Sequence, residues 1–173
     1  MNPFEAFHNI TTFVFDVDGV LTDGSLLLLP GGAMARRMNI KDGYALQLAV
    51  KQEYLVVAIS GGDSPEVIAR LNKLGVKNVF TQVKNKVEVL QKYLDEHNTE
   101  WSKVMFMGDD IPDLEVMLKV GLPCCPADAV CEIKVLSKYI SPIKGGEGCG
   151  RDIIEKIMRV QQRWVHDTEI RSK

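Results

Sequence analysis

The sequence predicts an α/β fold: a Rossmann-like three-layer sandwich with a central parallel sheet and a projecting β-hairpin. Short apolar runs of strand length alternate with longer segments of helical spacing, which is typical of a parallel sheet covered by helices on both faces. The chain has 173 residues, 46% of them hydrophobic, which suits one globular domain over residues 1–173. One segment, 24–39, interrupts the alternation and has the pattern of a hairpin.

The expected elements follow in chain order. Buried strands are predicted at 11–17, 54–60, 79–81 and 104–108, with a weaker strand at 139–142. Helices are predicted at 43–52, 64–75, 86–98, 112–121 and 151–165. The helix at 64–75 has the clearest ends, because Ser64 precedes Pro65 and Gly75 follows the last apolar position.

The segment 24–39 reads GSLLLLPGGAMARRMN, with its turn at 30–32. The four consecutive leucines at 26–29 make both faces of the first strand apolar, which is more than a two-stranded projection exposes in water. Two interpretations stay open for this segment. The hairpin folds onto the core of its own chain, or it forms an interface between subunits.

Charge and composition exclude several functional classes. The net charge of −2 provides no basic surface for nucleic acid and no polybasic segment for a membrane. The apolar runs are shorter than the roughly 20 residues of a membrane helix, and the first residues lack the pattern of a signal peptide. The four cysteines match neither a zinc site nor a disulfide scaffold. We therefore expect a cytoplasmic protein that has a small-molecule substrate and binds neither nucleic acid nor a membrane.

Polar side chains gather where the predicted strands end. Asp16 and Asp18 close the first strand in FVFDVDGVLTDG, and Ser60 ends the second and is followed by Gly61 and Gly62. The other such residues are Lys86 after the third strand and Asp109, Asp110 and Asp113 after the fourth. Ligands of open parallel sheets bind outside the carboxyl ends of the strands, so these groups are expected to line one mouth.

This combination has a chemical logic. Clustered carboxylates repel one another unless a cation lies among them, and Mg²⁺ is bound through carboxylates and substrate phosphate. A lysine, a serine hydroxyl and glycine amides suit a phosphoryl group. One carboxylate can attack phosphorus to form an aspartyl-phosphate, while a second protonates the leaving oxygen and later activates water. Each element alone is explained by a turn or a helix cap, but their shared order and placement favour the catalytic interpretation.

With these residues in these positions, the sequence resembles the haloacid dehalogenase superfamily of phosphatases. The resemblance rests on DVDGVLTDG, on Ser60 and Lys86 in their strand-end positions, and on GDDIPD at 108–113. It implies that Asp16 is the nucleophile and Asp18 the general acid/base, with Ser60 and Lys86 as the other catalytic groups. It further implies Mg²⁺ held by Asp16, the backbone carbonyl of Asp18 and Asp109, with Asp110 and Asp113 supporting that shell. The intervals between the motifs leave no room for a cap domain, so water exclusion must come from loops or a neighbouring subunit.

Within the superfamily, the chain looks most like the 3-deoxy-D-manno-octulosonate 8-phosphate phosphatases, which are capless, tetrameric enzymes of lipopolysaccharide biosynthesis. The features that carry this resemblance are LTDG with the hairpin, NIKDGYAL at 39–46, NK at 85–86, GDDIPDLEVM and GGEGCGRD at 145–152. On this basis we expect Gly61, Gly62 and Asp42 to contact the substrate. Two departures bear on the substrate, because relatives often carry Arg where this chain has Gly62 and where it has Glu147.

Three alternatives remain. A sister group acts on 2-keto-3-deoxynononate 9-phosphate but usually lacks the DGY form at 42–44. A non-catalytic tetramerisation module is the second, although the nucleophile, acid/base and metal aspartates are all present here. The third is a phosphoacceptor signalling domain, which the DxD spacing and the hairpin disfavour.

Overall fold

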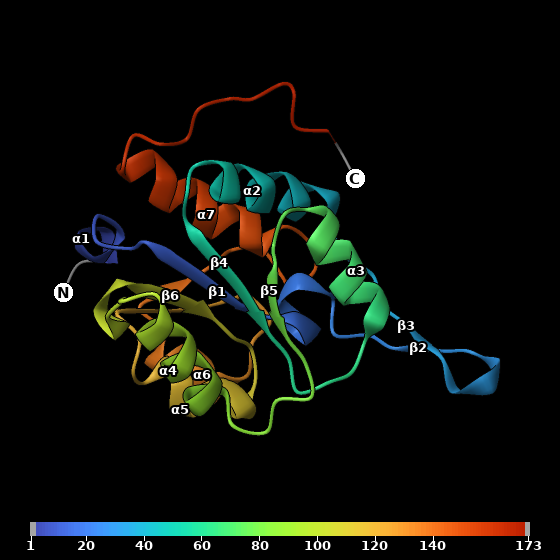
Figure 1. Ribbon diagram of the computed structural model, residues 1–173. Helices are drawn as coiled ribbons and strands as arrows, with labels where there is room; N and C mark the ends of the chain where they lie inside the picture. Colours follow the sequence, from blue (N-terminus) through green and yellow to red (C-terminus); the bar gives the residue numbers. More distant parts are fainter. Residues whose placement is uncertain (1–2, 172–173) are drawn as a thin grey trace.

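The computed structural model describes residues 3–171. They form three layers, in which helices cover both faces of a central six-stranded parallel sheet (Figure 1), so the predicted fold class is confirmed. The strands are β1 (Thr12–Asp16), β4 (Leu55–Ile59), β5 (Asn78–Phe80), β6 (Val104–Met107), β7 (Leu122–Cys125) and β8 (Tyr139–Ile140). Their spatial order is β5-β4-β1-β6-β7-β8, and β1 pairs in parallel with both β4 and β6. The strand order therefore reverses beside β1, at the position where open α/β sheets bind ligands.

Seven helices accompany the sheet within the described residues. They are α1 (Pro3–Phe7), α2 (Ile40–Lys51), α3 (Pro65–Lys73), α4 (Lys86–Glu96), α5 (Leu114–Met117), α6 (Cys131–Leu136) and α7 (Cys149–Val160), with 3₁₀ turns at Pro30–Gly32, Trp101–Lys103 and Ile111–Asp113. Because side chains alternate along a strand, Phe13 and Phe15 of β1 pack with α2 and α7, whereas Val14 packs with α4, α5 and α6. Both faces of β1 are buried, which explains its unbroken apolar run.

Most predicted elements are present, with shifted ends. The predicted strands occur, and the helices predicted at 43–52, 64–75, 86–98 and 151–165 correspond to α2, α3, α4 and α7. The predicted helix at 112–121 is wrong in length, because α5 covers only Leu114–Met117 before the chain turns and the Gly121 N–H bonds Trp101 O at 2.8 Å. The strand β7 and the helices α1 and α6 were not predicted from the sequence. The predicted single domain of 1–173 includes residues 1–2 and 172–173, which lie outside the described part of the chain.

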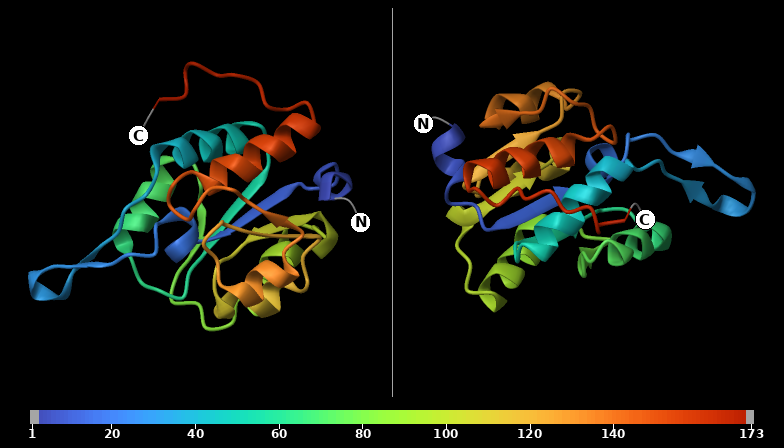
Figure 2. Two further views of the ribbon diagram at one scale, coloured as in Figure 1. Left: turned by 180° about the vertical axis from the view of Figure 1, so that it is seen from behind. Right: turned by 90° about the horizontal axis from the view of Figure 1, so that it is seen from above.

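The hairpin projects from the body of the molecule (Figure 2). Its strands β2 (Leu27–Leu28) and β3 (Met34–Ala35) are antiparallel and joined through Pro30–Gly32. Leu27 and Leu28 are 64% and 74% exposed, and Leu26, Leu29 and Met34 are exposed as well. The hairpin therefore does not fold onto the core of its own chain. The subunit interface stays a prediction.

Among the helices of residues 3–171, none combines the length and the apolar composition that crossing a membrane requires. The four cysteines are free thiols, and Cys124, Cys125 and Cys149 are buried.

Candidate active site

A cavity of about 360 Å³ lies at the carboxyl ends of β1, β4 and β6. Its lining includes Asp16, Asp18, Ser60, Gly61, Lys86, Asp109, Asp110 and Asp113. The structure thus brings together eight of the residues predicted from strand ends.

The turn after β1 places two aspartates at this cavity. Asp16 is the last residue of β1, and Val17–Leu21 form a tight helical turn that is interrupted at Asp18 and Gly19. Gly19 has φ of +90°, and a β-carbon there would lie 2.1 Å from Asp109 Oδ2. A side chain at position 19 would therefore collide with the carboxylate that faces the turn, which explains the glycine in DVDG.

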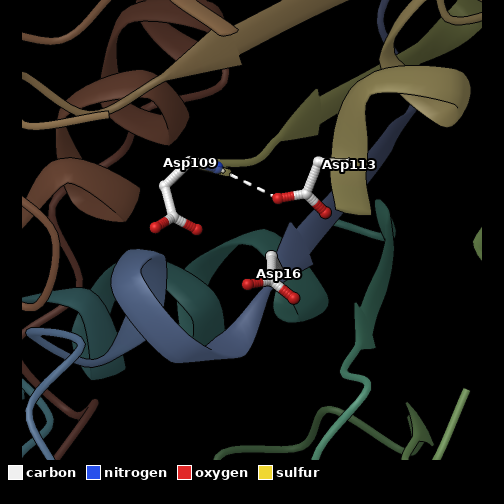
Figure 3. Close-up of side chains that lie close together, drawn as sticks. All are labelled: Asp16, Asp109 and Asp113. Atoms are coloured by element: carbon white, nitrogen blue, oxygen red, sulfur yellow. Dashed lines mark hydrogen bonds between the residues drawn. The ribbon is translucent and has the colours of Figure 1, made fainter. Parts of the chain in front are cut away.

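Three carboxylates converge from separate elements (Figure 3). Asp16 comes from β1, Asp109 follows β6, and Asp113 ends the 3₁₀ turn Ile111–Asp113; their ligand atoms lie within 4.8 Å of one another. Asp113 Oδ2 accepts a hydrogen bond from the Asp109 N–H at 3.0 Å, which ties the two together. Asp110 is exposed and caps the same 3₁₀ turn through the Ile111 N–H.

Lys86 supplies the counter-charge. Lys86 is the first residue of α4, and its side chain is buried. The preceding Asn85 caps this helix by accepting a hydrogen bond from the Glu88 N–H. Lys86 Nζ donates to Asp16 Oδ1 and to Asp113 Oδ1, each at 2.6 Å. A lysine that is buried between two carboxylates is held in one position, so this cation is oriented before any ligand arrives.

The environment opposes ionisation of the carboxylates. Burial, followed by the charge of Asp113, raises the pKa of Asp16 to about 7 in spite of Lys86. Burial and the neighbouring carboxylates, Asp16 first, raise the pKa of Asp109 to about 7. One lysine does not compensate for this concentration of negative charge, so the site favours an additional cation.

The donor set fits a hard divalent cation. The three clustered ligands are carboxylates, and oxygen ligands suit Mg²⁺, which keeps several waters and binds through one or two carboxylates. Asp16 and Asp109 are open to such an ion from the cavity, while Asp113 is bonded to Lys86 and to the Asp109 amide. Asp113 therefore holds Lys86 and the backbone of Asp109 in place.

Ser60 and the two following glycines form the β4 side of the cavity. Ser60 is buried. Its Oγ accepts a hydrogen bond from the Gly62 N–H at 3.0 Å and lies 3.5 Å from Asp18 Oδ2. Gly61 lines the cavity directly. A hydroxyl and exposed glycine backbone at a strand end can bind phosphate oxygens.

Two cations near the cavity were not predicted from the sequence. Lys84 lines it from the loop before α4. Arg36, at the base of the hairpin, donates from Nε to Asp18 Oδ1 at 2.6 Å. The basic pair at 36–37 is visible in the sequence, but a contact across 18 residues depends on the path of the hairpin.

Asp42 lies outside this cavity and is only 3% exposed. Its Oδ1 accepts from the Arg151 N–H at 2.6 Å, at the start of α7. Burial raises the pKa of Asp42 to about 6, although the N–H groups of Arg151 and Gly150 counteract that effect. Asp42 thus joins α2 to α7 and lies away from the cavity at which a substrate contact was predicted.

The glycine-rich loop at 145–148 supports the turn after β1. The Gly146 N–H donates to Val20 O at 2.9 Å, and the Gly145 N–H donates to Asp128 Oδ1 at 2.9 Å. A β-carbon at Gly145 would lie 1.9 Å from Gly19 O, so only glycine allows this approach. The loop at 145–148 thus contacts the turn that carries Asp18.

Comparisons with known proteins find relatives of this chain by sequence and by fold. The chain is 31% identical to the 3-deoxy-D-manno-octulosonate 8-phosphate phosphatase KdsC of Escherichia coli (strain K12) over 153 residues, which cover 88% of this chain and 81% of that protein. The structure of the phosphatase of that name from Moraxella catarrhalis, in complex with magnesium ion, phosphate ion and KDO, matches with a TM-score of 0.90 and 26% identity, covering 94% of this chain and 93% of that one. The cobalt-bound deoxy-D-mannose-octulosonate 8-phosphate phosphatase of Haemophilus influenzae matches with a TM-score of 0.87 and 27% identity over 91% and 92% of the two chains. No protein-family model matches the sequence.

Proposed function

The chain belongs to the 3-deoxy-D-manno-octulosonate 8-phosphate phosphatase family of the haloacid dehalogenase superfamily, and from this membership we propose how it hydrolyses that sugar phosphate. The products are the eight-carbon sugar acid and phosphate, and the reaction is a step of lipopolysaccharide biosynthesis. The observation that carries the proposal is the contact of Lys86 with both Asp16 and Asp113 beside Asp109. This arrangement combines a nucleophile, a fixed cation and a metal site at one strand end.

Asp16 attacks phosphorus. Lys86 binds Oδ1 of Asp16, which leaves Oδ2 as the attacking atom. The attack breaks the bond between phosphorus and the sugar oxygen and produces an aspartyl-phosphate, which divides one difficult hydrolysis into two easier steps. Lys86, the Ser60 hydroxyl and the Gly61 backbone bind the phosphoryl oxygens, and their orientation before reaction stabilises the developing charge.

Asp18 transfers the protons. Its carboxylate lines the same cavity, two residues from the nucleophile. It protonates the leaving sugar oxygen in the first step. In the second step it accepts a proton from the water that attacks phosphorus, while the bond between phosphorus and Asp16 breaks to release phosphate and the free Asp16 carboxylate. The fixed turn around Gly19 holds Asp18 for both steps.

The donor set fits Mg²⁺, which Asp16, the backbone carbonyl of Asp18 and Asp109 would hold. When bound, the ion would supply positive charge that offsets the charge of the phosphate during transfer. The supporting observations are the raised pKa of both carboxylates, about 7, and the all-oxygen donor set. Asp113 and Asp110 orient the loop that carries Asp109.

The enzyme acts in the cytoplasm as a homotetramer, assembled through hairpin 24–39. The exposed leucines at 26–29 give a physical reason for assembly, because a chain of this size rarely exposes four consecutive large apolar side chains to water. The absence of a cap leaves the described cavity open, so a neighbouring subunit is the natural means of excluding water.

Phosphate release from the eight-carbon and nine-carbon ulosonate phosphates, measured side by side with Mg²⁺, tests the proposal. We expect a higher kcat/KM for the eight-carbon sugar, since the two differ by one CHOH unit and pocket length with hydroxyl contacts can discriminate. Asp16→Asn is the control for contaminating phosphatase, because its amide keeps the size of the side chain and cannot attack phosphorus. A clear preference for the nine-carbon sugar would assign the chain to the sister activity, and normal turnover by Asp16→Asn would exclude the mechanism.

A further inference from the structure

Arg36 is unusual among the residues of the hairpin. Its side chain is 7% exposed, whereas that of the adjacent Arg37 is 70% exposed. Arg36 Nε donates to Asp18 Oδ1 at 2.6 Å, and Nη1 donates to Met34 O at 3.4 Å. A buried guanidinium needs partners, and its principal partner here is the acid/base of the proposed reaction.

Arg36 lies at the junction of two cavities. Its partner Asp18 lines the catalytic cavity of about 360 Å³. Arg36 itself lines a groove of about 530 Å³ between the hairpin and α3, together with Met34, Pro65 and Arg70. A ligand whose phosphate occupies the catalytic cavity and whose body extends along the groove passes this guanidinium.

The space beside Arg36 is kept open by a glycine. Nη2 of Arg36 has no hydrogen-bond partner among residues 3–171 and lies 3.4 Å from the position of a β-carbon at Gly62. The same β-carbon would lie 3.2 Å from Asp18 Oδ2. A side chain at position 62 would therefore crowd the ion pair, whereas glycine leaves Nη2 accessible to a ligand.

We propose that Arg36 is the specificity-determining residue that binds the substrate carboxylate in this chain. The inference rests on the proposed function, since an octulosonate 8-phosphate carries a carboxylate at the end opposite its phosphate. Guanidinium binds carboxylate through two parallel hydrogen bonds, and Nη2 provides the free donor for such a pair. On substrate binding, the guanidinium turns from Asp18 to this carboxylate, so a substrate without the carboxylate leaves Arg36 on Asp18.

The test compares the eight-carbon acid phosphate with its methyl ester, which removes the carboxylate charge and keeps the phosphate end. We expect the wild-type kcat/KM to fall by about 10- to 100-fold on esterification, mainly through KM, because a hydrogen-bonded charge pair is lost. Arg36→Met should lose a similar factor on the acid and treat acid and ester alike to within about threefold. Arg37→Met, at the exposed neighbour that pairs with Asp23, is the matched control and should keep the wild-type ratio.

The outcomes separate the two proposals. An Arg36→Met enzyme that keeps the wild-type preference for the acid, or that loses equally on acid and ester, would overturn the role of Arg36. Arg36→Lys covers the case in which Arg36→Met does not fold: it should show an intermediate acid-to-ester ratio, and an unchanged ratio would again overturn the role. A wild-type enzyme that hydrolyses neither compound would refute the proposed function itself and this inference with it.

Discussion

Replacing Asp42 by asparagine should increase the free energy of unfolding, relative to that of the wild type, by more at neutral pH than in mild acid. Asp42 is buried between α2 and α7, its Oδ1 accepts from the Arg151 N–H, and its Oδ2 is buried without a partner in the described structure. Burial raises the pKa of this carboxyl from 3.8 to about 6. In the folded state the group therefore holds its proton at pH values where the unfolded chain has released it.

The sign follows from proton linkage. A raised pKa in the folded state contributes stability that is fully present below pH 3.8 and is lost as the pH rises through about 6. The difference of about 2 pH units corresponds to about 3 kcal/mol in total, of which about 2 kcal/mol is lost between pH 4.5 and pH 7.5. Asparagine resembles the protonated acid and does not titrate, so Asp42→Asn avoids this loss.

Urea denaturation of both proteins in EDTA, at about pH 4.5 and about pH 7.5, measures the effect. The free energy of unfolding of Asp42→Asn minus that of wild type should rise by about 2 kcal/mol between these conditions. Any constant cost of the asparagine NH₂ group cancels in this comparison, as does titration of the catalytic carboxylates. A difference between the two proteins that does not change with pH would refute the reasoning.

Three further predictions concern the site and the hairpin. Saturation with Mg²⁺ at about 100 times its Kd should raise Tm by about 5–10 °C in scanning fluorimetry, and an undiminished rise in Asp109→Ala would locate the cation elsewhere. Lys86→Met should lower the free energy of unfolding in EDTA by about 3 kcal/mol, since two buried carboxylates lose their counter-charge; unchanged urea denaturation would contradict this. Leu27→Asp combined with Leu28→Asp should give smaller species in light scattering, because the two charges lie on opposite faces of β2, and an assembly of wild-type size would exclude the hairpin as the interface.

The central strands were predictable because each is buried on both faces. β1, β4 and β6 are continuous apolar runs, a pattern set by the helices on either side. β7 escaped prediction because it contains Pro123, which lacks an N–H and is unusual inside a sheet. In the structure Pro123 pairs with Phe106, and its carbonyl accepts from the Lys138 N–H at 2.9 Å. Parallel pairing to β6 and β8 thus outweighs the local preference.

Part of the site was predictable by the same logic. Asp16 ends a strand of the parallel sheet, and Ser60 and Asp109 follow two others, so their convergence is a consequence of topology. The contact of Arg36 with Asp18 depends instead on the angle at which the hairpin leaves the body. The burial of Asp42 was not predictable, because a motif position does not reveal which side of a helix faces the core.

The contact between the loop at 145–148 and the turn after β1 has a consequence for the time at which activity appears during synthesis. All the proposed catalytic side chains are translated by Asp113, but the backbone that holds Asp18 rests on Gly145 and Gly146. A nascent chain that has passed Asp113 therefore carries the chemical groups without the support that fixes their positions. Because a domain folds as a unit, an acidic, half-built site stays unproductive until almost the entire chain has emerged from the ribosome.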